Sequence, residues 1–125
     1  MKVTKEFLKD HPECIFVFGD NLIRYGKKGA AELRDEPNTY GFITKKAPSF
    51  KDSAYYRSEE YKPLFEKEWQ KLIDLIESNP DKIFLISKLG SGLANKYNIY
   101  DKIIRPRISE LSKYENVQLL FQEDS

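Results

Sequence analysis

The sequence is short of the residues that many enzyme and metal sites need. It contains one cysteine, Cys14, and one histidine, His11, among 125 residues. A single cysteine excludes an internal disulfide and a thiolate metal cluster. A single histidine argues against a Ser-His-Asp triad and against a metal site of several histidines. We therefore expect no metal and no cofactor, and we interpret His11 as a surface or capping residue.

Long apolar runs and an excess of one charge are also missing. No stretch approaches the roughly 20 apolar residues that cross a bilayer, and the first residues lack an apolar signal core. The formal net charge is only +1, whereas binders of duplex DNA or anionic membranes are usually strongly basic. We expect a cytoplasmic protein that binds neither membrane nor duplex DNA.

The residues that are present are enough for one folded domain over 1–125. Forty per cent of them are hydrophobic, with eight Phe and eight Tyr, and 125 residues is an ordinary domain length. No linker or repeat interrupts the chain.

Apolar runs alternate with helical patterns along the sequence. The runs predict four strands and the intervening spacing predicts helices. The predicted strands are Cys14–Phe18, Tyr40–Thr44, Ile83–Ile86 and Val117–Phe121. The predicted helices are 4–9, a short one near Gly29, a long one from Ser58 with its apolar stripe from Phe65 to Ile76, and 99–111 interrupted by Pro106.

This alternation predicts an α/β fold of three layers. A mostly parallel sheet would carry helices on both faces, because right-handed crossovers join parallel strands. In such sheets ligands bind beyond the carboxyl ends of the strands. Three segments of unusual composition follow strands here, namely 19–29, 44–48 and 87–96.

Glycines in these loops indicate either an anion site or ordinary tight turns. Gly90 and Gly92 separate the third strand from the next helical segment. Main-chain N–H groups in such a turn can hold a phosphate, yet a plain turn uses the same glycines. The loops also hold seven bases against one acid, Asp20, which favours an anion site unless the lysines merely solvate the loops. The bases are Arg24, Lys27, Lys28, Lys45, Lys46, Lys88 and Lys96.

Two motifs resemble a family of small phage and bacterial proteins related to the macro domain. They are Phe-Gly-Asp-Asn-Leu at 18–22 and Leu-Gly-Ser-Gly-Leu-Ala at 89–94, with Gly26 to Ala31 and Ile43-Thr44-Lys45 between them. Macro domains bind ADP-ribose. The resemblance therefore implies a macro-like fold and an ADP-ribose-like nucleotide as ligand. For a phage protein it would imply the host cytoplasm.

The resemblance also assigns roles to residues. It implies that Asp20 and Asn21 contact the adenosine or ribose and that Gly29 and Ala30 line the distal side. The segment from Gly90 to Leu93 would hold the pyrophosphate. The complete predicted site comprises Gly19, Asp20, Asn21, Arg24, Gly29, Ala30, Thr44, Lys45, Leu89, Gly90, Ser91, Gly92 and Leu93.

Several functions are compatible with such a site. The first is a binding module for an ADP-ribose-like nucleotide. A second is a metal-free hydrolase of ADP-ribosylated protein or nucleotide, with Asp20 as the base and Asn21 positioning the ribose, although an acid here can equally bind a hydroxyl or cap a turn. A third is a phage protein that sequesters a host nucleotide immune signal. A fourth is a binder of single-stranded nucleic acid through the aromatics and lysines of 51–62.

Overall fold

A computed structural model describes residues 2–122 as an α/β fold around one four-stranded sheet. All strand pairs are parallel and the strand order is β2-β1-β3-β4. The strands are β1 (Cys14–Asn21), β2 (Thr39–Lys45), β3 (Ile83–Ile86) and β4 (Val117–Leu119). The predicted parallel sheet is therefore confirmed.

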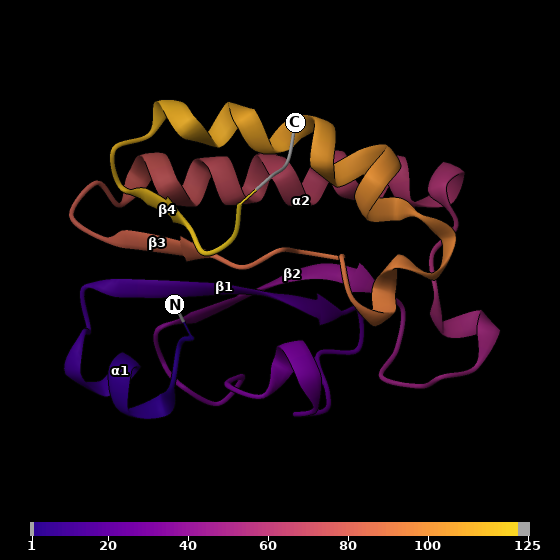
Figure 1. The fold of residues 1–125 in the computed structure, drawn as a ribbon, viewed down its shortest axis with the longest axis horizontal. Helices are drawn as coiled ribbons and strands as arrows, with labels where there is room; N and C mark the ends of the chain where they lie inside the picture. The colour runs from indigo at the N-terminus through magenta and orange to yellow at the C-terminus, as the bar shows by residue number, and fades with distance from the viewer. Residues whose placement is uncertain (1, 123–125) are drawn as a thin grey trace.

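Helical segments cover both faces of this sheet (Figure 1). On one face lie α2 (Ser58–Ser78) and the C-terminal segments η4 (Tyr100–Ile104) and η5 (Arg105–Lys113). On the other face lie α1 (Lys5–Asp10) and the short 3-10 turn η1 (Gly29–Ala31). Two further 3-10 turns, η2 (Asp52–Ala54) and η3 (Leu93–Tyr97), lie in the loops after β2 and β3.

The main core lies between the sheet and α2. The apolar stripe of α2 faces the sheet, as its helical spacing predicts. Trp69 is 3% exposed and packs against the rings of Phe42 and Phe65. Trp69, which belongs to the apolar stripe of α2, is therefore a core residue.

The predicted C-terminal helix has an unusual geometry because of Pro106. A π turn, η4, precedes a 3-10 helix, η5, and the Arg105 N–H donates to the Tyr100 carbonyl five residues earlier. Proline supplies no N–H for a regular α-helical bond. The chain stays helical by changing its hydrogen-bonding pattern on either side of this residue.

The connection that follows β1 and the connection that follows β3 run on opposite faces of the sheet. From β1 the chain passes through η1 to β2 on one face, and from β3 it passes through η4 and η5 to β4 on the other (Figure 1). Since β1 and β3 are neighbours, the strand order reverses between them. This is where open α/β sheets form a crevice for ligands.

Candidate functional site

A pocket of about 760 Å³ opens at this reversal, beyond the carboxyl ends of β1, β2 and β3. Three loops wall it. The loop after β1 contributes residues 25–31, the loop after β2 contributes Pro48 and Phe50, and the loop after β3 contributes residues from Ser87 to Ala94. The first two loops touch, since a Cβ built on Gly26 would lie 3.2 Å from the Pro48 Cβ.

The structure brings most of the predicted site residues to this pocket. Arg24 and Leu89 are the exceptions, and their side chains point elsewhere in the protein. The residues that line it are Gly19, Asp20, Asn21, Gly29, Ala30, Thr44, Lys45, Gly90, Ser91, Gly92 and Leu93. Their contact with a ligand remains a prediction.

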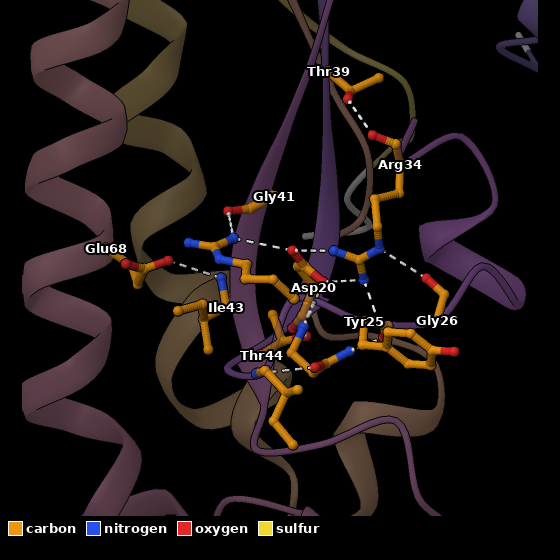
Figure 2. A network of polar contacts seen from close by, with 12 residues as sticks. Asp20, Tyr25, Gly26, Arg34, Thr39, Gly41, Ile43, Thr44 and Glu68 are labelled. Carbon is orange, nitrogen blue, oxygen red and sulfur yellow. Dashed lines mark hydrogen bonds and ion pairs between the residues drawn. The ribbon is translucent and has the colours of Figure 1, made fainter. Parts of the chain in front are cut away.

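Asp20 is the centre of a polar network and not a free carboxylate (Figure 2). Its side chain is 2% exposed. Arg34 donates to both carboxylate oxygens, at 2.5 and 2.9 Å. Arg24 adds a bond at 3.0 Å and the Asn21 N–H another at 2.8 Å. Burial opposes ionisation of this carboxyl, but the bonds from both arginines and the Asn21 N–H outweigh it, so the pKa of Asp20 is lowered.

This geometry corrects the predicted role of Asp20 as a general base. A base must accept a proton from a substrate within hydrogen-bonding reach. The Asp20 oxygens already accept four bonds, and its lowered pKa makes it a weaker base. Asp20 therefore has a structural role, because it binds Arg24, Arg34 and the Asn21 N–H.

Arg34 is the residue that the sequence reasoning missed. Besides Asp20 it binds the carbonyl oxygens of Gly26, at 2.8 Å, and Tyr25, at 3.3 Å (Figure 2). It therefore fixes the loop after β1 against the sheet. Asp20 was the signal in the sequence that could have indicated such a residue, because a buried carboxylate needs a cationic partner.

Asn21 also shapes this loop. Its amide donates to the Tyr25 carbonyl at 2.8 Å and accepts from the Ile23 N–H at 3.1 Å. Gly19, Asp20 and Asn21 belong to β1, not to a loop as predicted. They continue the ladder with β2 as far as Lys45, with an irregularity between Asp20 and Asn21.

Arg24 and Leu89 are corrections to the predicted site. Arg24 has a left-handed backbone, with φ of 62°, and its guanidinium binds the Gly41 carbonyl at 2.6 Å as well as Asp20. It closes the outer edge of β2 and does not line the pocket. Leu89 is 1% exposed and belongs to the core.

The basic residues of the loops divide into two groups. Arg24, Lys46 and Lys96 pair with Asp20, Glu60 and Asp52 respectively, each within 3.0 Å. The other four line the pocket, and they are Lys27, Lys28, Lys45 and Lys88. Fewer basic residues are therefore available at the pocket than the sequence implied, but four of the seven line it.

Lys45 has the most defined environment of the pocket lysines. Its ammonium donates to the Ser49 carbonyl at 3.0 Å and lies 4.6 Å from the centre of the Tyr55 ring. Partial burial lowers the pKa of Lys45. Lys27 pairs with Asp35, and Lys88 lies over the Tyr100 ring.

The glycine loop after β3 lines the pocket. Gly90 has φ of 76°, and a Cβ there would lie 2.7 Å from the Ile104 Cδ1. Gly92 faces open space, with nothing within 4 Å of a built Cβ. Among residues 2–122, no group accepts a hydrogen bond from the N–H of Gly90, Gly92 or Leu93.

Exposed apolar side chains stand around the mouth of the pocket. Tyr25, Phe50 and Leu93 line it and are 72%, 70% and 64% exposed. The sequence reasoning assigned Leu93 to the site but not Tyr25 or Phe50. A large aromatic ring that neither packs in the core nor caps an element is a candidate for stacking on a ligand.

The described residues, 2–122, lack the features of two other classes of site. They contain no group of three or more His, Cys, Asp or Glu side chains that would hold a metal ion. They also contain no helix that is long and apolar enough to cross a membrane.

Comparison with known proteins connects the pocket to a family. Neither a curated protein nor a solved structure matches the chain. A family model matches residues 1–97, a span that includes every residue lining the pocket and ends before η4, η5 and β4. The chain belongs to DUF7831, a family of unknown function.

Proposed function

We propose that the protein binds an ADP-ribose-like nucleotide in the pocket at the carboxyl edge of the sheet. One observation carries the proposal. At the point where the strand order reverses, the loop after β3 lines a pocket together with lysines, and within residues 2–122 the N–H groups of Gly90, Gly92 and Leu93 have no hydrogen-bond acceptor. Main-chain donors in a glycine turn, with cations beside them, are the usual partners of phosphate groups.

The volume and the rim support a nucleotide rather than a free phosphate. A volume of about 760 Å³ falls within the roughly 300–1,000 Å³ of pockets that bury a drug-sized molecule. Tyr25 and Phe50 at the mouth present rings on which a base can stack. The phosphates would lie at Gly90–Leu93, with Lys45 and Lys88 adding charge, and the base would lie toward the rim.

Binding is better supported than hydrolysis. The one carboxylate that lines the pocket, among the described residues, is Asp20, and its oxygens are engaged by Arg24, Arg34 and the Asn21 N–H. His11 follows α1 and pairs with Glu13, and it does not line the pocket. Sequestration of a nucleotide signal would require the same binding without turnover.

Two measurements test the proposal: the identity of small molecules that purify with the protein, and the affinity of the emptied protein for ADP-ribose. The protein is purified from cells, denatured, and the released small molecules are identified by mass spectrometry. Emptied protein is then titrated calorimetrically with ADP-ribose. We expect a nucleotide with a diphosphate in the extract and saturable binding at one site per chain. An extract without nucleotides, together with no heat from ADP-ribose, ADP or NAD, would refute the proposal.

A further inference from the structure

Apart from the lysines and the Tyr25 hydroxyl, the polar side chains that line the pocket already make hydrogen bonds within the protein. Asp20 accepts four bonds, and both ends of the Asn21 amide bind the main chain. The hydroxyls of Thr44, Ser87 and Ser91 donate to the carbonyls of Asp20, Val17 and Lys88 at 3.3, 2.8 and 2.7 Å. The three hydroxyl oxygens can still accept a hydrogen bond, but their hydrogens are already donated to the protein.

Two kinds of group with hydrogen-bond donors remain for a ligand. They are the ammonium groups of Lys28, Lys45 and Lys88 and the N–H groups of the glycine loop. Lysine donates and cannot accept. The Tyr25 hydroxyl can do both, but its ring is 72% exposed on the rim. The pocket is therefore suited to a molecule rich in acceptors, and the acceptor-rich part of a nucleotide is its phosphates.

Recognition of a particular base requires donors and acceptors together, and not donors alone. Bases are told apart by fixed pairs of donors and acceptors along their edges, and a site that makes such bonds rejects the wrong partner strongly. Stacking on an aromatic ring accepts any base, because every base has a π-face. Tyr25 and Phe50 offer the second kind of contact, whereas the Asp20 carboxylate and the Asn21 amide, which could make the first kind, are bonded within the protein.

We infer that the site selects its ligand by the number of phosphates and not by the base. This inference rests on the proposed function, and it names the ligand class as nucleoside diphosphates and their sugar conjugates with any base. It also changes the role that the resemblance implied for Asp20, since a carboxylate held by two arginines does not recognise adenine.

Two titration series on the emptied protein test the inference. The first compares ADP, GDP, CDP and UDP, whose dissociation constants we expect to agree within about threefold, or under one kcal/mol. The second compares adenosine, AMP and ADP. Each phosphate removed should weaken binding about tenfold or more, because a charge-assisted hydrogen bond contributes at least that factor.

The two possible failures are distinguishable. A preference of more than about tenfold for one base, or adenosine binding as tightly as ADP, would overturn the inference while leaving nucleotide binding intact. Absence of binding by every nucleotide would overturn the proposed function and the inference with it.

Variants separate the stacking contact from the phosphate contact. Tyr25→Ala should weaken all four diphosphates by a similar factor, about five- to hundredfold for one lost stack. Lys88→Met should weaken ADP more than adenosine and leave the order of the bases unchanged. Lys67→Met on the exposed face of α2, away from the pocket, should bind as wild type. Base selectivity that appears or disappears in Tyr25→Ala would contradict a stacking contact that ignores base identity.

Discussion

At the scale of single residues, Asp20 shows how an apparent catalytic group becomes structural. Its carboxylate is buried at the end of a central strand and would be costly without its two arginines. Arg34 reaches it from fourteen positions along the chain, and also holds the loop that carries Tyr25. We therefore expect Asp20→Asn to act first on folding, the reverse of what its place in the sequence implies.

The Asp20 network predicts a specific dependence of stability on pH. The folded-state pKa of Asp20 is lowered, so its contribution is present above the unfolded pKa of about 3.9 and is lost as pH falls through the folded pKa. Urea unfolding of wild type between pH 3 and 7 should show this loss. Asp20→Asn should unfold more easily at pH 7, by about 3–5 kcal/mol for a broken buried pair, and should have a flatter profile. Parallel profiles would show that Asp20 does not contribute to the acid sensitivity.

Gly90 and Gly92 have different reasons to be glycine. Gly90 has φ of 76° and a built Cβ would meet Ile104 at 2.7 Å, whereas the corresponding position at Gly92 is empty. Gly90→Ala should lower the free energy of unfolding by about 1–2 kcal/mol from the left-handed backbone alone, and Gly92→Ala should cost less. Chemical denaturation of the two variants makes the comparison. Equal losses would mean that the loop after β3 is not packed on Ile104.

At the scale of elements, side chains close the outer edge of β2. Glu68 on α2 accepts from the Ile43 N–H at 2.8 Å (Figure 2), and the Tyr61 hydroxyl donates to the Ile43 carbonyl at 2.6 Å. Arg24 binds the Gly41 carbonyl beside them. An edge strand with unpaired main-chain groups is a template for aggregation, so these contacts protect the sheet as well as stabilise it.

The contribution of the hydrogen bond between the Ile43 N–H and Glu68 can be tested with two variants. Glu68→Ala leaves a buried N–H without a partner, which costs about 1–3 kcal/mol. Glu68→Gln keeps a carbonyl oxygen on a side chain of the same length and should unfold close to wild type. Urea unfolding, followed by light scattering at the midpoint, measures both effects. If Gln proves as damaging as Ala, the carboxylate charge matters rather than the hydrogen bond to Ile43.

Element order was predictable from the sequence because each strand and the long helix carry strong local patterns. The apolar runs at Cys14 and Ile83 became the two central strands. The end of β1 was not predictable, since Gly19, Asp20 and Asn21 resemble a loop until Arg24 and Arg34 are placed beside them. The π turn at Tyr100–Ile104 was not predictable either, since apolar spacing does not distinguish a π turn from an α-helix.

The position of the site was predictable for a similar reason, and its chemistry was not. Loops that follow parallel strands must meet at one edge, so the glycine loops after β1 and β3 fell together. Which side chains face the pocket depends on contacts across the fold. Arg24 binds the Gly41 carbonyl on β2, and Leu89 packs in the core. Tyr25 and Phe50 remain exposed at the rim of the pocket.

At the scale of the whole molecule, the balance of charge limits what the protein can bind. The net charge is +1, and several loop bases are paired with acids. We expect no tight binding of duplex DNA at physiological salt, because such binding grows with the number of phosphates neutralised. A gel-shift titration at two salt concentrations tests this. Submicromolar affinity that falls steeply with salt would contradict the expectation.

The central claim is that the loop after β3 holds the phosphates of a nucleotide. Gly92→Glu fills the open space beside that loop with a side chain of the wrong charge, and Gln118→Glu adds the same charge on exposed β4, outside the pocket. Losing two charge-assisted hydrogen bonds costs about 3–6 kcal/mol, so calorimetric titration with ADP-ribose should show Gly92→Glu at least about a hundredfold weaker. Gln118→Glu should bind as wild type, and circular dichroism should show both variants folded. Equal affinity of folded Gly92→Glu and wild type would contradict the claim.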